Sequence, residues 1–349
     1  MRFVWTCCFS ILCCLLLRVG IAIAVTPAAN YHLLKTYDIG GGDGKTEYWD
    51  YMTFDDSARR LFLSHGTEVK VVSADTGMVL GTIGGLIHNH GIALVKDLGE
   101  GFISDGGGNR VVIFDLATLK VVGQVATGTN PDCILYDPVS RHIFVMDGGT
   151  KDATVIDPTD GSVIGTVPLG GRPEYAVSDG KGMIYDNIED KSEVVALDTR
   201  TLTIRSRWTI APAGEASAMA MDTEHRRLFI GGRNKIFAVM NADSGKVIQT
   251  FPIGDGVDAN VYERNTGLVF SSVREGILYI FHEDTPDQFS FVRAVKTQFG
   301  ARTMGLDAKT YNIFLDTAEF GPPPAPTATQ PHPQPVPIPG TFRLLVFGR

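Results

Sequence analysis

Cysteine is almost absent from this 349-residue chain beyond its first fourteen residues. Cys7, Cys8, Cys13 and Cys14 stand near the N-terminus, and Cys133 is the only cysteine that follows them. One remaining thiol cannot form an intramolecular disulfide. Cys133 begins an apolar run, and we interpret it as a small buried hydrophobic residue rather than a nucleophile.

Positive charge is also scarce. The chain has 31 Lys and Arg residues against 39 Asp and Glu residues, a formal net charge of −8, and no basic cluster. Nucleic acids and anionic membrane surfaces attract proteins through clustered basic side chains. We therefore expect no nucleic-acid partner.

Several motifs that carry enzyme chemistry are missing as well. The sequence has no C-x-x-C-H haem attachment motif, no G-x-S-x-G nucleophile elbow and no H-E-x-x-H zinc motif. The glycine runs at 40–42 and 106–108 stand between predicted strands, with no helix to follow, so we interpret them as turns rather than phosphate cradles. The sequence thus names no cofactor.

The longest apolar run lies at the N-terminus. Arg2 precedes an apolar stretch from Phe3 to Leu17, and Ala22-Ile23-Ala24 has the small residues of a cleavage site. This pattern predicts a secretory signal peptide over residues 1–24. A retained membrane anchor is the alternative, but the run is short and Arg18 interrupts it. We expect a periplasmic or secreted protein without stable membrane insertion after signal cleavage.

The rest of the chain is dominated by an internal repeat of about forty-two residues. An apolar pair, usually ending in Phe, marks each unit, and an Asp- or Asn-containing turn follows it about thirteen residues later in six of the seven. The pairs are Leu61-Phe62, Gly101-Phe102, Ile143-Phe144, Met183-Ile184, Leu228-Phe229, Val269-Phe270 and Ile313-Phe314.

One unit, from Asp132 to Gly170, shows what the repeat encodes. It contains four short apolar runs, which are separated by the turn signals Asp137-Pro138, Gly148-Gly149 and Asp160-Gly161. Four strands in about forty residues match a propeller blade. Leucine-rich and ankyrin repeats would need a helix in each unit, and no sustained helical periodicity is present. The sequence predicts an all-β, seven-bladed propeller with four-stranded blades.

The seventh unit lacks one strand, and the N-terminal part of the chain can supply it. Residues 31–39 resemble the outer strand of the fifth unit, so we predict that they close the last blade. Residues 31–349 then form a single domain. A Pro-rich loop at 321–340 is inserted between the second and third strands of that blade, on the same side as the channel mouth. The sequence leaves three roles possible for this loop: a spacer, a lid or an arm that docks a partner.

The repeat resembles the bacterial YVTN/YncE-like family of seven-bladed propellers. The resemblance covers residues 31–349 and rests on the pattern x-P-x-φ-φ-φ-D, φ-F-V and φ-D-x-x-T-G-x-V, which is clearest in 130–170 and 219–254. The second and fifth units depart from it at His88-Asn89-His90 and Glu215-Ala216-Ser217. The resemblance implies an exported binding propeller, and it says little about chemistry.

The repeat also places candidate site residues. The first strand of each blade lines the axial channel, so equivalent residues that open these strands should form a ring at one mouth. Counting about twelve residues back from each anchor, and about ten in the fourth unit, gives Asp50, His90, Asp132, Glu174, Ser217, Asp258 and Arg302. The neighbours expected to add a second layer are Trp49, His88, Arg172 and Asn260, with Tyr48, Asn130, Tyr175 and Glu215 as further candidates.

Four carboxylates and a histidine in one funnel could hold a divalent cation or a small polar ligand, although a wet channel mouth would be polar without either. Arg172 and Arg302 could instead receive an anionic group such as a carboxylate. A His88–His90 metal pair is a weaker hypothesis than channel hydrogen bonding, because the sequence fixes no third ligand.

We expect a monomeric, exported binding or scaffolding propeller whose top face contacts a small polar ligand or a protein partner. The alternative is a propeller enzyme of quinoprotein-like or lactonase-like type, in which the four ring carboxylates would serve as metal ligands or base. The cofactor stays unknown in both hypotheses, with a divalent cation as the one candidate.

Overall fold

The computed structural model describes Met1 and residues 30–41, 47–327, 331 and 333–349. Apart from Met1, the predicted signal peptide lies outside these residues. In the described part, short strands are separated by turns, and the helical segments bounded on both sides by described residues are three 3-10 turns: η2(Lys96–Leu98), η3(Gly106–Gly108) and η4(Glu189–Lys191). No helix there is long and apolar enough to cross a membrane.

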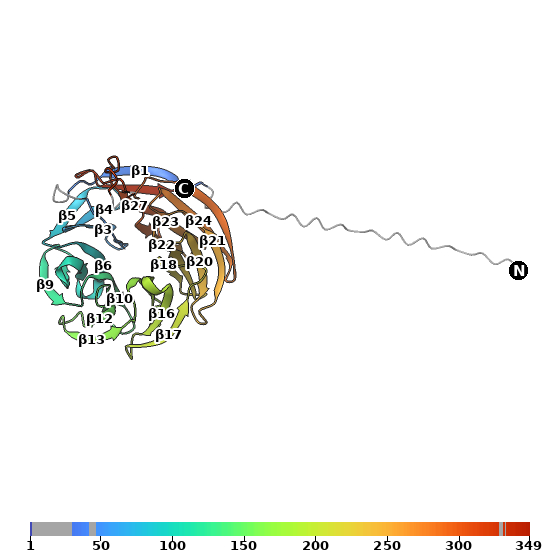
Figure 1. The fold of residues 1–349 in the computed structure, drawn as a ribbon, viewed down its shortest axis with the longest axis horizontal. Helices are drawn as coiled ribbons and strands as arrows, with labels where there is room; N and C mark the ends of the chain where they lie inside the picture. Colours follow the sequence, from blue (N-terminus) through green and yellow to red (C-terminus); the bar gives the residue numbers. More distant parts are fainter. Residues whose placement is uncertain (2–29, 42–46, 328–330, 332) are drawn as a thin grey trace.

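The strands form seven four-stranded antiparallel sheets arranged in a ring (Figure 1). Blades 1 to 3 contain β2(Met52–Asp55), β3(Arg60–His65), β4(Glu68–Ser73), β5(Val79–Gly84); β6(Asn89–Val95), β7(Glu100–Asp105), β8(Arg110–Asp115), β9(Val121–Ala126); and β10(Pro131–Asp137), β11(His142–Asp147), β12(Asp152–Ile156), β13(Val163–Pro168). Blades 4 to 6 contain β14(Pro173–Ser178), β15(Met183–Ile188), β16(Glu193–Asp198), β17(Thr203–Thr209); β18(Ala216–Asp222), β19(Arg227–Gly232), β20(Ile236–Asn241), β21(Val247–Pro252); and β22(Val257–Glu263), β23(Leu268–Val273), β24(Ile277–Thr285), β25(Gln288–Lys296). Blade 7 contains β26(Met304–Asp307), β27(Asn312–Thr317), β28(Arg343–Gly348) and β1(His32–Asp38).

The seventh blade is closed by the N-terminal strand. Its sheet order is β1-β28-β27-β26, and β1 pairs antiparallel with β28 from His32 opposite Gly348 to Asp38 opposite Arg343. The first and the last described strands therefore belong to one sheet, and Figure 1 shows β1 at the same side of the ring as the C-terminus. The predicted propeller and its closure by residues 31–39 are confirmed.

The hydrophobic core is divided into seven clusters, each between two adjacent blades. Phe62, Phe144 and Phe270 are fully buried and pack toward the next blade. In blade 4 the predicted pair is displaced by one residue. Ile184 faces blade 3, whereas Tyr185 faces blade 5 as the Phe anchors do.

Cys133 lies in the core between blades 3 and 4 and is 4% exposed. Burial raises the pKa of its thiol. This agrees with its interpretation as a small hydrophobic residue.

The recurring Asp or Asn after the third strand forms the turn into the outer strand. In blade 5, Asn241 Oδ1 accepts hydrogen bonds from the N–H groups of Asp243 and Ser244, both at 2.9 Å. Gly245 follows with a φ of 69° and donates its N–H to the Asn241 carbonyl at 2.9 Å. A left-handed residue is needed there, which explains the glycine of the repeat.

The Pro-rich loop connects β27 and β28, and its described ends lie on the side of the channel mouth. Phe320 and Pro337 form an isolated bridge, and the N–H of Gly340 donates to Glu47 Oε1. Pro337 also lines a small cavity of about 190 Å³ together with Trp49. The described ends of the loop thus rest on the face where the candidate site lies.

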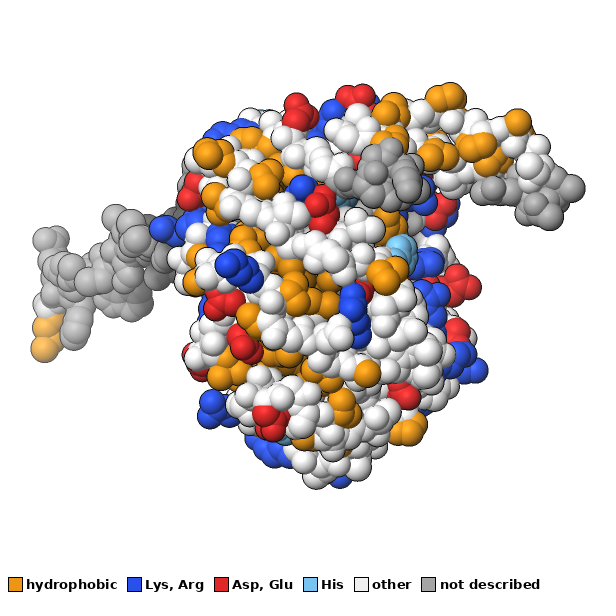
Figure 2. Space-filling view, turned by 90° about the vertical axis from the view of Figure 1, so that its left-hand side faces the viewer, with side chains coloured by type: hydrophobic (Ala, Val, Ile, Leu, Met, Phe, Trp, Pro, Cys, Tyr) orange, Lys and Arg blue, Asp and Glu red, His pale blue; other side chains and the backbone are white. Residues whose placement is uncertain are grey.

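The rim of the ring carries exposed apolar side chains between charged ones (Figure 2). They occur in pairs at the start of the outer strands: Val79 and Leu80, Val121 and Val122, and Val163 and Ile164. Each pair lies at a register shift between the third and fourth strands of its blade. At such a shift, side chains of successive residues need not alternate between the two faces of the sheet.

Candidate functional site

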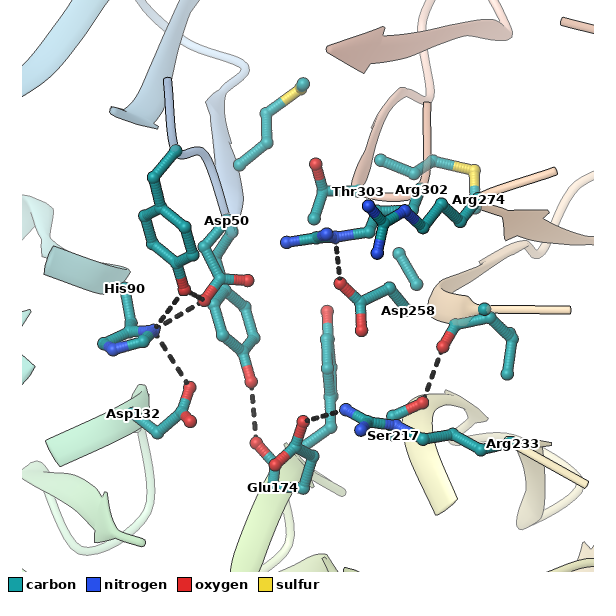
Figure 3. Close-up of a pocket in the computed structure, with 18 of the residues that line it drawn as sticks. Asp50, His90, Asp132, Glu174, Ser217, Arg233, Asp258, Arg274, Arg302 and Thr303 are labelled. Carbon is teal, nitrogen blue, oxygen red and sulfur yellow. Dashed lines mark hydrogen bonds and ion pairs between the residues drawn. The ribbon is translucent and has the colours of Figure 1, made fainter. Parts of the chain in front are cut away.

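The ring of polar positions lines one pocket at the mouth of the axial channel. The pocket has a volume of about 400 Å³ and receives residues from every blade (Figure 3). The structure brings all seven ring residues to it: Asp50, His90, Asp132, Glu174, Ser217, Asp258 and Arg302.

One side of the pocket holds a cluster of acids around a histidine. His90 Nδ1 lies 2.6 Å from Asp50 Oδ2 and 3.6 Å from Asp132 Oδ1. The Tyr48 hydroxyl donates to Asp50 Oδ2 at 2.9 Å and lies 3.2 Å from His90 Nδ1. Blades 1, 2 and 3 each contribute to this cluster, so its geometry depends on the packing of three blades.

Burial and neighbouring charges shift the pKa values of His90, Asp50 and Asp132 in different directions. Burial alone would lower the pKa of His90, but Asp132 and Asp50 raise it to about 9. Burial opposes ionisation of Asp50, yet the hydrogen bond and charge of His90 hold its pKa below the ordinary value. Burial, aided by Asp50, raises the pKa of Asp132 to about 7 in spite of His90. Near neutral pH, Asp132 can therefore donate or accept a proton.

A second part of the wall is a network of two acids and two arginines. Arg172 lies 3.2 Å from both Glu174 Oε2 and Glu189 Oε2. Arg233 lies 3.2 Å from Glu174 Oε1 and 3.0 Å from Glu189 Oε1. Burial raises the pKa of Glu174, and the nearby Asp132 adds to this effect. Each guanidinium thus contacts both carboxyl groups.

On the opposite wall, Arg302 contacts Asp258. Arg302 Nε lies 2.7 Å from Asp258 Oδ2, and Nη2 donates to the Trp49 carbonyl at 3.1 Å. Burial raises the pKa of Asp258, while Arg302 counteracts it. Ser217 is turned to the backbone, because its hydroxyl donates to the Val257 carbonyl at 2.6 Å.

Arg274 differs from the other arginines of the pocket. Within the part of the chain that the structure describes, no acidic side chain lies at ion-pair distance from it, and its Nε is buried without a hydrogen-bond partner. Its guanidinium lies 5.6 Å from the ring centre of Phe299 and, in Figure 3, beside that of Arg302. Burial, and the charge of Arg302, lower the pKa of Arg274.

Two of the four second-layer residues line the pocket. His88 stacks on Tyr48 with ring centres 4.1 Å apart, and Arg172 takes part in the network described above. The other two point elsewhere. The Trp49 indole packs against Phe342 in the core between blades 7 and 1, and the Asn260 amide donates to a backbone carbonyl of blade 5.

The directions of Trp49 and Asn260 have a backbone cause. Trp49 is next to Asp50, and successive side chains of an extended segment point to opposite faces. Asn260 is two residues after Asp258, but a register shift between Val257 and Ala259 intervenes. An irregularity of this kind changes which face a side chain takes.

Sequence reasoning missed a second set of equivalent positions, in the turns between the second and third strands. The N–H groups of Glu189, Arg233 and Arg274 donate to backbone carbonyls that precede the inner strands of their own blades. The same bond is made by Gly106 and Gly148 in other blades. The sequence could have indicated this set, because its members stand four residues after the last residue of each anchor pair (Tyr185 in blade 4). Three units have glycine at this position, including Gly66, so the position does not look polar in the sequence.

The apolar part of the lining includes Tyr51 and Tyr175, whose ring centres are 5.2 Å apart, together with Met52, Val257 and Met304. The Tyr51 hydroxyl donates to the Glu174 carbonyl at 2.6 Å, which fixes its ring. The pocket therefore combines charged groups with two rigid aromatic surfaces. This composition suits the binding of a small polar molecule.

Comparisons with known proteins show the fold and leave the finer family open. No protein-family model and no curated protein matches the sequence. Among solved structures, Kuenenia stuttgartiensis hydrazine synthase matches with a TM-score of 0.68 and 14% identity, over 78% of this chain and 93% of that chain. In all, 1805 chains of solved structures match, so the fold is too common to indicate an activity. The YVTN/YncE-like assignment stays a prediction, and the chain is shown to be a seven-bladed β-propeller.

Proposed function

We propose that this protein is an exported binding propeller whose axial pocket holds a small polar molecule with a carboxylate or similar anionic group. The observation that carries the proposal is Arg274, a cation that faces the pocket without an acidic partner among the described residues. A carboxylate can accept two parallel hydrogen bonds from a guanidinium. Arg302 beside it adds a second positive charge.

The pairing of charges around the pocket supports an anion at this point. Arg302 contacts Asp258, His90 contacts Asp50, and the two other arginines contact two glutamates. Asp255 at the margin lies 3.5 Å from Lys235. Arg274 is left over as a positive charge, while Asp132 is the acid that burial holds partly protonated. An anionic group would therefore balance Arg274 without displacing an existing pair.

The remainder of such a ligand would meet hydrogen-bonding groups. Asp132 and His90 lie across the pocket from Arg274 in Figure 3, and Tyr51 and Tyr175 supply the apolar lining. A pocket of about 400 Å³ is large enough for a molecule of the size of an amino acid or a dicarboxylate. The signal-peptide prediction places the binding event in the periplasm or outside the cell.

The experiment is a calorimetric binding screen of the mature protein with monocarboxylates, dicarboxylates and α-amino acids. We expect one class to bind, and Arg274→Gln to weaken that binding by about tenfold or more, because a hydrogen bond to a charged group contributes about 1.5–3 kcal/mol. The melting temperature of the variant should equal or exceed that of the parent, since the variant removes a half-buried cation whose Nε is buried without a hydrogen-bond partner.

The matched control is Arg264→Gln, which changes a largely exposed arginine in the turn that follows β22, at the end opposite the pocket. It should leave the affinity unchanged. The proposal is wrong if Arg274→Gln binds as tightly as the parent, or if no carboxylate in the screen binds.

A propeller enzyme with a metal at the same mouth is the second candidate. The observation in its favour is that ligand-type atoms of Asp50, His90 and Asp132 all lie within 4.8 Å of one another. Elemental analysis of protein purified without chelators tests it. A stoichiometric metal in the parent protein that is lost in Asp132→Asn would favour this candidate. A parent protein that contains no metal and still binds a carboxylate would favour the binding module.

A further inference from the structure

A second cluster of acids and a histidine lies on the axial face opposite the pocket, where blades 5 and 6 meet. Asp222 ends β18, His225 stands in the following turn, and Glu283 lies near the end of β24. His225 Nδ1 is 2.7 Å from Asp222 Oδ2 and 3.2 Å from Glu283 Oε1. The cluster shares no residue with the pocket and does not depend on the function proposed for it.

Comparison between blades shows that Glu283 is unusual. The residue at this position donates its N–H to the carbonyl of the residue that leads into the second strand of its own blade. The donors in four other blades are Ala74, Leu116, Thr199 and Ala242. All are buried and uncharged, and blade 6 alone among these five places a carboxylate here.

At two other blade junctions an arginine from the next blade contacts the acid at the end of the inner strand, whereas blades 2, 4 and 6 have glycine at the arginine position. At the junction of blades 7 and 1, Arg59 contacts the acid that ends the preceding inner strand, Asp307, at 2.6 Å. At the junction of blades 4 and 5, Arg226 contacts Asp179 at 3.0 Å. The residue equivalent to these arginines in blade 6 is Gly267, as its carbonyl hydrogen bond to Glu283 shows. Asp222 therefore has no arginine from the next blade.

Glu283 is poorly satisfied where it lies. Its side chain is 4% exposed, and neither carboxylate oxygen accepts a hydrogen bond of good geometry. Burial raises the pKa of Glu283, the charge of Asp222 adds to this, and Tyr262 and His225 counteract it. The nearby Arg227 contacts Asp287 at 2.8 Å, and its charge counteracts the raised pKa of Glu283 only in part. Two buried acids thus converge on one imidazole.

We propose that this cluster is a binding site for a divalent transition-metal ion, with Asp222, His225 and Glu283 as protein ligands. Their ligand-type atoms lie within 4.8 Å of one another. Tetrahedral coordination with bonds of about 2.0–2.1 Å needs ligand atoms about 3.3 Å apart, so small side-chain movements suffice. The mixture of one imidazole and two carboxylates suits zinc better than calcium, which prefers oxygen ligands alone.

The surroundings provide support and access for the ion. Asp222 accepts the N–H of Glu224 on one oxygen and that of His225 on the other, which orients its carboxylate. His225 is 42% exposed, and an open cavity of about 300 Å³ is lined by His225, Glu283 and His282. A metal can enter from solvent, and water can complete its coordination.

The test is isothermal titration and thermal unfolding of the chelator-treated mature protein with Zn²⁺, and with Ca²⁺ for contrast. We expect Zn²⁺ to raise the melting temperature and Ca²⁺ to have little effect. Glu283→Ala should weaken Zn²⁺ binding by about tenfold or more. In the presence of chelator its melting temperature should equal or exceed that of the parent, because alanine occupies this position in blades 1 and 5.

His225→Asn is a second variant, at an exposed turn where folding is not at risk, and it should lose Zn²⁺ affinity in the same way. Asp160→Asn, which changes an exposed acid in the turn between β12 and β13, is the matched control and should retain it. Asp132→Asn separates the two clusters, because it should lower the Zn²⁺ affinity only if the ion binds in the pocket of the other face. Absence of Zn²⁺ binding to the parent, or unchanged affinity in both Glu283→Ala and His225→Asn, would overturn the proposal. So would loss of affinity in Asp132→Asn alone.

Discussion

At the scale of single residues, one equivalent position in the blades has different electrostatics according to its neighbours. Asp105 and Asp147 both end the second strand of their blades. Asp105 contacts Arg110 at 2.8 Å, whereas Asp147 accepts hydrogen bonds from Thr154 and, in the described chain, has no cation at ion-pair distance. In blade 4 the same strand ends in Ile188. The fold therefore does not require a charge at this position.

Asp147→Asn should change how stability depends on pH. Burial raises the pKa of Asp147 from 3.8 to about 6 in the folded protein, so folding favours its protonated form. The stability that this protonation contributes is fully present below pH 3.8 and is lost as the pH rises through about 6. The loss amounts to at most about 3 kcal/mol in the free energy of unfolding. Urea unfolding at pH 4 and pH 7.5 measures the free energy of unfolding of both proteins. The value for the variant should increase relative to that for the parent at the higher pH. An equal difference at both pH values would contradict the assignment.

The polar ring was predictable at the residue scale because the repeat makes positions equivalent before any contact is known. The directions of Trp49 and Asn260 were not, since they depend on strand parity and on a local register shift. Arg274 was missed because turn residues carry no apolar period, and glycine fills the same position in three blades.

At the scale of elements, the sequence predicts the strands well and their register less well. In the unit from Asp132 to Gly170, the apolar runs are 133–136, 143–146, 153–156 and 162–169, and they coincide with β10 to β13 to within one or two residues. The anchor of blade 4 was placed one residue early, because Met183, Ile184 and Tyr185 are all large and apolar. An apolar pattern alone cannot decide which of three such neighbours faces the next blade. The pairing of Val177 with Tyr185 decides it.

The closing strand β1 gives a prediction at this scale. Its pairing with β28 covers an edge, and the preceding Tyr31 is 1% exposed and donates its hydroxyl to the Tyr311 carbonyl at 2.7 Å. A protein that starts at Asp38 should be less stable than one that starts at Ala28, by about 3 kcal/mol or more. It should also aggregate more readily through the exposed edge of β28.

Chemical unfolding and light scattering measure these two effects. The variant Lys35→Ala, which changes an exposed side chain of β1 and keeps the strand, serves as the control and should behave like the longer protein. If the shortened chain is equally stable and equally soluble, β1 does not close the ring.

At the scale of the whole molecule, the division of the core between blades determines how the protein unfolds. Each of the seven clusters is shared by two blades, and the ring is closed, so the loss of one blade exposes apolar surface on both neighbours. An open repeat array can lose units from its ends. A closed ring of this kind should instead unfold as a unit.

The tryptophans permit a direct test of this cooperativity. The predicted mature chain has Trp49 in blade 1 and Trp208 in blade 4, on different sides of the ring. In Trp208→Phe the fluorescence reports blade 1, and in Trp49→Phe it reports blade 4. Within each variant, the fluorescence transition should coincide with that of circular dichroism to about 1–2 °C. Separate transitions would show that the blades unfold independently.

The sheet formed by β1 and β28 has a consequence in time. Of the described strands, β1 leaves the ribosome first and β28 last, with about 300 residues between them. At about 5–20 residues per second, β1 waits roughly 15–60 seconds for its partner. The ring therefore cannot close before β28 has been synthesised, and until then the nascent chain keeps the two parts of its final sheet apart.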